Sequence, residues 1–294
     1  MPLLAGALTA LVLAPGALRT FGENGWTRTN FRGRALPFPG GVVAVAAALL
    51  AMGAMAALDE LAGTTLLRRD PLAVSGCDPR DGHCLTRDTL AALATWAVPL
   101  LAGVAFLGLV DDLLEAPPRG WRGHAAAVLR GRLSTGALKA AGTLALALLV
   151  LSGVGFEAGE YVLAVAVVVL ATNLFNLLDL RPGRSGKVAV ALVAVVLLVS
   201  GDADPLRPLG AFAGALVVLV AFDVRERTML GDAGSNVIGA VCGLWLVMSL
   251  GVTGQLVALA LLLALTAYGE LRSISATVER STVLRALDRL GRPR

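Results

Sequence analysis

The feature of this sequence that most constrains its fold is a series of long apolar runs separated by short charged segments. Such runs recur at roughly 3–18, 41–58, 91–110, 137–154, 159–177, 188–200, 208–222, 234–250 and 255–268. A spanning helix needs about 20 apolar residues, and inside a bilayer only helices or closed barrels satisfy their backbone hydrogen bonds. Because the runs are long and do not alternate, they predict an all-α, polytopic membrane bundle with about nine transmembrane helices.

The chain shows neither a repeat of 20 to 50 residues nor an extramembrane segment long enough to fold alone. With 56% hydrophobic and only 16% charged residues, it is too apolar for a soluble domain of this size. We therefore predict a single integral membrane domain over residues 1–294. The first run has no basic segment before it and no cleavage pattern after it, so we expect a retained span.

Basic residues are distributed unevenly between the two sets of loops. The segments 19–40, 111–136, 178–187, 223–233 and 269–294 hold 20 of the 25 basic residues, counting Lys139 at the edge of the second. By the positive-inside rule this set is cytoplasmic. The last of these segments is a cytoplasmic tail that we expect to form an amphipathic surface helix.

Two cysteines, Cys77 and Cys84, lie in the long loop predicted to be external, where the redox environment permits pairing. We favour a disulfide that closes this loop. The alternative is a metal clip with His83, which is one ligand short of a tetrahedral site. Cys242 lies inside a span and is expected to be a small apolar core residue.

Asp111 and Asp112 end the third apolar run on the predicted cytoplasmic side. Ionisable groups at that depth cost free energy and usually serve a function. Glu115 lies one helical turn beyond Asp111, so these two share a face while Asp112 points about 100° away. One aspartate would then bind a metal ion while the other handles a proton. The alternative is a helix end marked by solvated acids.

Asn173, Asn176 and Asp179 are spaced by three at the end of the fifth run, on the same side. Such a stripe faces either a cavity or a neighbouring helix, where asparagines act only as interhelical contacts.

The loop that follows holds Arg181, Arg184 and Lys187 among glycines. Guanidinium groups bind phosphate oxygens in pairs, and glycines let the backbone approach an anion. The loop is therefore predicted to bind phosphate, although the same cations would also anchor the topology.

Asp232 lies between Gly231 and Gly234, where the eighth run begins. A helix N-terminus can receive an anion, whereas a turn with an N-terminal cap is the alternative reading. The candidate metal ligands are all oxygens, which favours Mg²⁺ held by one or two carboxylates and substrate phosphates. We expect Asp232 and Asp112 to bind this Mg²⁺.

Four motifs, taken in order, resemble those of the polyprenyl-phosphate N-acetylhexosamine-1-phosphate transferases, the superfamily of phospho-N-acetylmuramoyl-pentapeptide transferase. They are Pro-Phe-Pro-Gly-Gly at 37–41, Gly-Leu-Val-Asp-Asp at 108–112, Asn-Leu-Phe-Asn-Leu-Leu-Asp at 173–179 and Met-Leu-Gly-Asp-Ala-Gly-Ser at 229–235. The similarity extends from about residue 20 to about residue 250. Two features differ: Pro182 replaces the family's second loop acid, and residues 269–294 lack the family's histidines.

The resemblance implies an enzyme that transfers a sugar 1-phosphate from a UDP-sugar to a polyprenyl phosphate and releases UMP, with Mg²⁺ as cofactor. It implies a multi-pass protein of the bacterial cytoplasmic membrane whose site faces the cytoplasm and serves cell-envelope glycan synthesis. By analogy it allows a homodimer, and we expect no nucleic-acid partner.

By the same resemblance, Asp232 is the Mg²⁺ ligand, Asp111 the acid that activates the lipid phosphate, and Asp112 its electrostatic partner. The residues expected to bind substrate are Arg32, Arg34, Lys139, Asn173, Asn176, Asp179, Arg181, Arg184 and Lys187.

Three other functions stay open at this point. The first is a catalytically silent homologue that binds lipid phosphate or nucleotide. The second is an intramembrane prenyl transferase that uses Asp111, Asp112 and Glu115 around Mg²⁺. The third is a transporter, although the sequence lacks the paired broken helices that usually mark one.

Overall fold

The structure is a computed structural model that describes all residues except 65, 67–86, 115–129, 132–133 and 294. Cys77, Cys84 and Glu115 lie outside the described residues, so the predicted disulfide and the role of Glu115 stay predictions.

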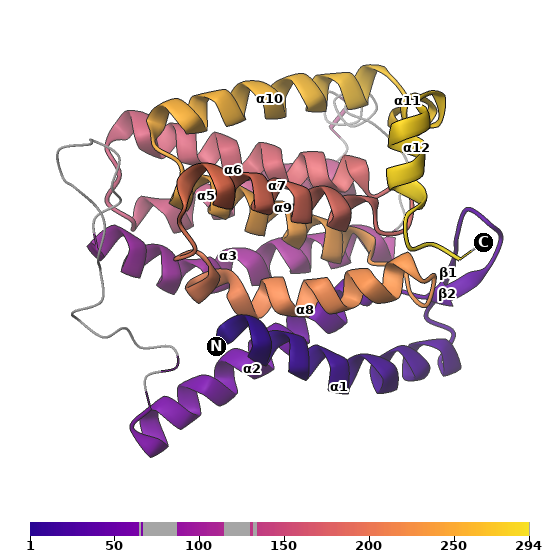
Figure 1. Ribbon diagram of the computed structural model, residues 1–294, viewed down its shortest axis with the longest axis horizontal. Coiled ribbons are helices and arrows are strands. Elements are labelled where there is room, and N and C mark those ends of the chain that lie inside the picture. The colour runs from indigo at the N-terminus through magenta and orange to yellow at the C-terminus, as the bar shows by residue number, and fades with distance from the viewer. Residues whose placement is uncertain (65, 67–86, 115–129, 132–133, 294) are drawn as a thin grey trace.

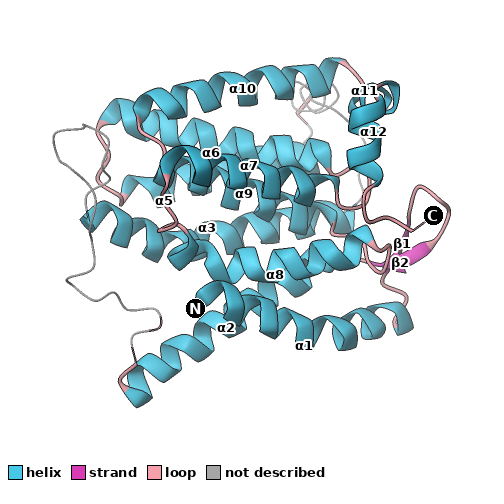
Figure 2. Cartoon of the chain, viewed as in Figure 1, coloured by secondary structure: helices cyan, strands magenta, loops and turns pink. Residues whose placement is uncertain are grey.

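Each of the nine predicted apolar runs forms a helix, and together they make one bundle (Figure 1). In chain order these helices are α1 (Pro2–Glu23), α2 (Gly40–Ala62), α3 (Arg87–Leu114), α5 (Thr135–Ser152), α6 (Ala158–Leu178), α7 (Arg184–Ser200), α8 (Leu206–Val224), α9 (Gly231–Ser249) and α10 (Val252–Leu271). Figure 2 shows how little of the described chain is not helical. The prediction of an all-α polytopic membrane bundle is confirmed.

Eight of these helices are long and apolar enough to cross a membrane, among the residues that the structure describes. The ninth, α7, has 17 residues. At 1.5 Å per residue it is about 25 Å long, slightly less than the roughly 30 Å of a hydrocarbon core.

Helix α9 lies at the centre of the bundle and packs against α2, α3, α6 and α7. Every residue from Ala233 to Met248 is buried. Close helix packing of this kind depends on small residues. A Cβ atom on Gly239, for example, would lie 2.6 Å from the carbonyl oxygen of Ala171 in α6. The start of α9 is therefore held firmly in place by its neighbours.

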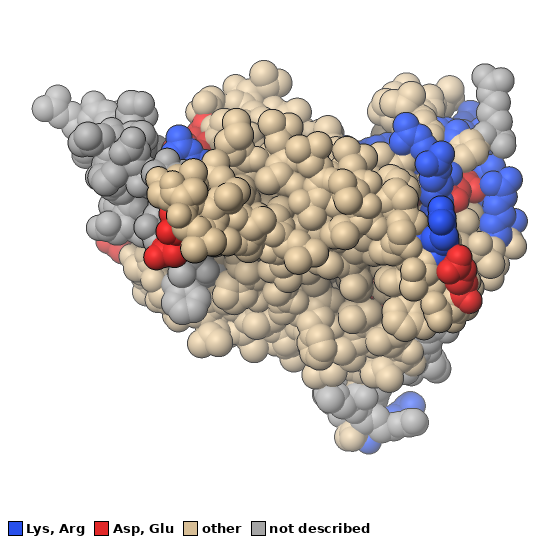
Figure 3. Space-filling view, turned by 90° about the horizontal axis from the view of Figure 1, so that it is seen from below, with Lys and Arg blue, Asp and Glu red and all other residues tan. Residues whose placement is uncertain are grey.

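Charged side chains gather at one end of the bundle. Figure 3 shows Lys and Arg concentrated at its right-hand end, whereas the broad middle of that face is uncharged. Figure 1 places four short elements at this end: the antiparallel strands β1 (Thr27–Thr29) and β2 (Ala35–Pro37), and the helices α11 (Ile274–Arg280) and α12 (Thr282–Arg289). Large apolar side chains such as Leu11, Leu149 and Leu198 are exposed around the bundle, as expected for a surface that meets lipid.

The β1–β2 hairpin is joined to the loop that precedes α9. The backbone N–H groups of Gly40 and Gly41 donate to the carbonyl oxygens of Met229 (2.8 Å) and Leu230 (2.9 Å). The N–H group of Met229 donates in return to the carbonyl oxygen of Pro37, at 3.1 Å. These bonds place the hairpin directly beside the N-terminus of α9.

Candidate active site

Two carboxylates converge on one ammonium group at the charged end of the bundle. The Nζ atom of Lys139, in α5, donates to Asp111 Oδ2 of α3 at 2.7 Å and also to Asp232 Oδ2 of α9. It lies 3.4 Å from the side-chain oxygen of Asn176 in α6. All three charged side chains are partly open to solvent. Four predicted site residues from four helices therefore meet at one point.

Asp112 is placed differently from its neighbour Asp111. Its carboxylate accepts hydrogen bonds from the backbone N–H groups of Asp232 (2.9 Å) and Ala233 (3.0 Å), and its side chain is only 1% exposed. A carboxylate in this position stabilises the N-terminus of a helix by binding its free N–H groups. Asp112 thus fixes the start of α9, the segment that carries Asp232. As a metal ligand it remains a prediction.

Gly231 is required beside this carboxylate for two reasons. Its φ is 72°, in the left-handed region that glycine adopts without a steric penalty. A Cβ atom there would also lie 2.6 Å from Asp112 Oδ2. The Gly-Asp pair of the motif therefore combines a backbone requirement with a functional carboxylate.

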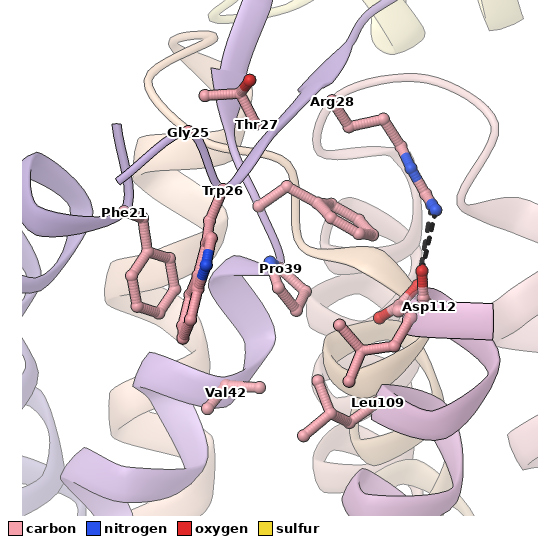
Figure 4. A pocket seen from close by; sticks show the side chains of 11 residues that line it. Phe21, Gly25, Trp26, Thr27, Arg28, Pro39, Val42, Leu109 and Asp112 are labelled. Atoms are coloured by element: carbon pink, nitrogen blue, oxygen red, sulfur yellow. Dashed lines mark hydrogen bonds and ion pairs between the residues drawn. The ribbon is translucent and has the colours of Figure 1, made fainter. Parts of the chain in front are cut away.

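An apolar cavity of about 560 Å³ opens beside Asp112. Figure 4 shows Phe21, Trp26 and Val42 along this cavity, with the Arg28–Asp112 ion pair at one edge. Arg28 Nη1 lies 3.7 Å from Asp112 Oδ1, and its guanidinium group lies 3.8 Å from the centre of the Phe38 ring. The site thus has an apolar side with a cation at its border.

A second, polar cavity of about 130 Å³ lies on the other side of Arg28, between the hairpin, the loop after α6 and the start of α9. Asp179, Arg181, Asp223 and Asp232 are among its lining residues. Asp179 accepts a hydrogen bond from the Ser185 hydroxyl at 2.8 Å. Burial raises the pKa of the Asp179 carboxyl well above its usual value, and the nearby charge of Asp223 adds to this effect.

Of the predicted asparagine stripe, only one member belongs to this network. Asn176 donates to Ser235 Oγ at 3.2 Å as well as facing Lys139. Asn173 is exposed, and no hydrogen bond joins its side chain to the described residues of the cluster.

The loop predicted to bind phosphate is partly covered by the C-terminal helices. Arg184 Nε donates to Asp288 Oδ1 of α12 at 2.8 Å, and Lys187 Nζ donates to the Asp288 carbonyl oxygen at 2.7 Å. Burial alone would raise the pKa of the Asp288 carboxyl. The hydrogen bonds that Arg184 and Arg292 donate to it outweigh burial, so its pKa lies below the usual value. Arg181 is held only weakly, 3.9 Å from Glu279, and is the cation of this loop that borders the polar cavity.

Arg32 and Arg34, predicted to bind substrate, form ion pairs with Glu226. Glu226 Oε1 lies 3.0 Å from Arg32 Nε, and its Oε2 lies 3.5 Å from Arg34 Nη1. Glu226 itself is buried in the loop between α8 and α9, with a φ of 54°. These pairs tie the hairpin to the site.

The sequence reasoning missed Arg28, Asp223 and Glu226. Arg28 lies in strand β1 and Glu226 in the loop between α8 and α9, and in the sequence both segments resemble ordinary basic flanks of a span. In the sequence, Asp223 resembles a solvated acid at the end of a span. In the structure its carboxylate accepts a hydrogen bond from the Gly183 N–H at 2.5 Å and shapes the loop after α6. Only the neighbouring motifs indicated that the segments with Arg28, Asp223 and Glu226 could belong to a site.

Among the described residues, no three His, Cys, Asp or Glu side chains form a ready metal cage. Mg²⁺ does not require one, because it typically uses one or two carboxylates and completes its shell with water and substrate phosphates. Asp111 and Asp232 already converge on a cation, the Lys139 ammonium group. Their oxygen atoms fit Mg²⁺ in the presence of a phosphate ligand.

Comparison with known proteins identifies the family of this chain. The family model for glycosyl transferase family 4 matches residues 94–250, which is more than half of the chain and includes Asp111, Lys139, Asn176 and Asp232. Comparison with curated proteins finds no match. The chain belongs to glycosyl transferase family 4, the family of polyprenyl-phosphate hexosamine-1-phosphate transferases, whose members transfer sugar phosphates to lipid carriers.

Proposed function

We propose that this protein transfers a sugar 1-phosphate from a UDP-sugar to a polyprenyl phosphate and releases UMP. The observation that carries the proposal is the meeting of Asp111, Lys139, Asn176 and Asp232 at the charged end of an apolar bundle. An apolar cavity and a polar cavity border this point, which suits one lipid substrate and one nucleotide substrate.

In the proposed reaction an oxygen of the lipid phosphate attacks the β-phosphorus of the donor. A new phosphorus–oxygen bond forms to the lipid, and the bond from the β-phosphorus to the bridging oxygen breaks, so that UMP leaves with that oxygen. Lys139 supplies a fixed positive charge beside the reacting phosphates. A phosphate monoester is already largely ionised near neutral pH, so Asp111 has only a small proton-removal task.

We propose that Asp232, with Asp111 beside it, holds Mg²⁺ when the donor is bound. The metal would neutralise charge on the diphosphate. Asp112 as a further ligand is less favoured, because both of its oxygens accept backbone N–H groups at the start of α9. We assign it to positioning Asp232.

The two cavities suggest how the substrates approach. The apolar cavity of Figure 4 suits the isoprenyl chain of the acceptor, with Arg28 near its phosphate. The polar cavity suits the donor nucleotide, which Asp179 and Arg181 in its lining would contact. Asn176 would reach the donor from beside Lys139. We propose that the site faces the cytoplasm of a bacterial cell, where UDP-sugars are available for cell-envelope synthesis; the basic loops at this end support this orientation by the positive-inside rule.

The proposal is tested by incubating the purified protein in detergent with undecaprenyl phosphate and a panel of UDP-sugars labelled in the sugar. We expect labelled lipid from at least one donor, with Mg²⁺ present and not with a chelator. A folded protein that gives no lipid product with any donor would instead support a silent homologue that only binds these ligands.

A further inference from the structure

A pocket of about 510 Å³ lies on the outer side of the polar cavity, between the hairpin loop, Arg181 and the C-terminal helices α11 and α12. Its charged lining is unbalanced. Five arginines line it, namely Arg32, Arg181, Arg285, Arg289 and Arg292, against two acids, Glu279 and Asp288. The pocket therefore carries a net positive charge before any ligand enters.

The two acids neutralise only part of this charge, and Arg32 is paired with Glu226 outside the pocket lining. Asp288 is bound by Arg292 and by Arg184, which lies behind the pocket, with N–O distances of 2.8 to 3.2 Å. The Glu279 side chain is 63% exposed, and its Oε1 atom lies as far as 3.9 Å from Arg181 Nη2. A pair so exposed and so distant is weak.

Arg285 and Arg289 are the cations that lack a counter-charge. Neither side chain has a hydrogen bond or ion pair within the part of the chain that the structure describes. They are four residues apart on α12, so their like charges lie on one face and repel each other. An anion between them would remove this repulsion.

The orientation of α12 supports an anion site between Arg285 and Arg289. Its large apolar residues, Val283, Leu284, Leu287 and Leu290, are exposed, whereas its charged face lines the pocket. An amphipathic helix with an exposed apolar face is suited to the membrane interface. Arg285, which is half-buried, and Arg289, which is exposed, then line the pocket from the opposite face of the helix.

The pocket also adjoins the proposed active site. Phe31 and Arg181 line both this pocket and the polar cavity that contains Asp232. The guanidinium group of Arg181 lies 4.5 Å from the centre of the Phe31 ring, so the two form the shared wall. A bound anion would therefore lie next to the donor side of the site.

We infer that this pocket binds a multiply charged phosphate group, with Arg285 and Arg289 as its principal ligands. Guanidinium groups bind phosphate through paired, charge-assisted hydrogen bonds. The group would belong either to a soluble nucleotide or to the headgroup of an anionic phospholipid. The inference concerns binding alone, so it does not depend on the transfer reaction.

The test is calorimetric titration of the full-length protein in neutral detergent with inorganic pyrophosphate, with a chelator present to suppress binding through Mg²⁺. We expect the Arg285→Gln/Arg289→Gln variant to bind at least about tenfold more weakly than the unaltered protein. The matched control is Arg272→Gln/Arg280→Gln, which removes two exposed arginines of the same segment that do not line the pocket. Arg285→Lys/Arg289→Lys should lie between, because lysine keeps the charge without the paired hydrogen bonds.

Equal affinities in the pocket variant and the control variant, or no pyrophosphate binding by the unaltered protein, would overturn the inference. Competition then identifies the source of the phosphate group. Displacement of pyrophosphate by UDP assigns the pocket to a soluble nucleotide. Weaker pyrophosphate binding in nanodiscs that contain phosphatidylglycerol than in phosphatidylcholine nanodiscs assigns it to a lipid headgroup.

Discussion

Replacing Asp232 with asparagine is expected to lower the transfer rate by about 10²- to 10³-fold, the usual cost of losing one electrostatic contact to a reacting group. The substitution keeps the size of the side chain but removes the negative charge. Lys139 keeps its hydrogen bond to Asp111 at 2.7 Å, so we expect the fold to persist. The measurement is the initial rate of lipid product formation at several Mg²⁺ concentrations, together with thermal unfolding in detergent.

The matched control for this substitution is Glu23→Gln. Glu23 is exposed at the end of α1 and carries the same charge, yet it lines none of the described cavities of the site. It should leave the rate and its Mg²⁺ dependence unchanged. An Asp232→Asn protein that keeps both full activity and metal dependence would remove Asp232 from the site.

Replacing Asp112 with alanine is expected to destabilise the protein by about 3 kcal/mol, because two backbone N–H groups at the start of α9 lose their acceptor and Arg28 loses its partner. Asp112→Asn keeps one acceptor oxygen and should have a smaller effect. Thermal unfolding in detergent should rank the unaltered protein first, then Asp112→Asn, then Asp112→Ala.

The adjacent residue provides the control for Asp112. Asp111→Asn changes a side chain that is more exposed and bonded to Lys139, so it should reduce transfer with little loss of stability. Equal unfolding temperatures for Asp111→Asn and Asp112→Ala would contradict the positioning role of Asp112.

The helices of this protein were predictable because a lipid bilayer allows few other backbone structures. A backbone in the hydrocarbon region must satisfy its own hydrogen bonds, so each apolar run became a helix. The boundaries were less accurate. The third run was expected to end near residue 110, but α3 continues to Leu114, so Asp111 and Asp112 lie in its last turn. Polar residues at the end of a helix do not mark where its hydrogen bonds stop.

The site was predictable to the extent that motifs marked it. Asp111, Asn176 and Asp232 lie in the motifs and converge on Lys139, which lies in none of them. Their roles in the reaction stay predictions. Which of two adjacent aspartates faces the cluster was not predictable, because it depends on where α9 begins relative to α3.

The partners of the loop arginines were equally hidden from the sequence. Arg184 binds Asp288, about a hundred residues later in the chain, and Arg32 binds Glu226. Ion pairs between distant segments follow from tertiary packing and leave no local pattern. The segment from Arg181 to Lys187, whose last four residues form the start of α7, therefore contributes fewer free cations to the proposed donor side than its composition indicated.

The central claim is most directly tested by the fate of the donor's β-phosphate. A UDP-sugar labelled with ³²P at the β-position is incubated with the purified protein, undecaprenyl phosphate and Mg²⁺, and the lipid and aqueous phases are separated. Transfer of a sugar 1-phosphate predicts that the label enters the lipid phase and that UMP is released without it. Label that stays in the aqueous phase as UDP, while the sugar enters the lipid, would contradict the proposed reaction.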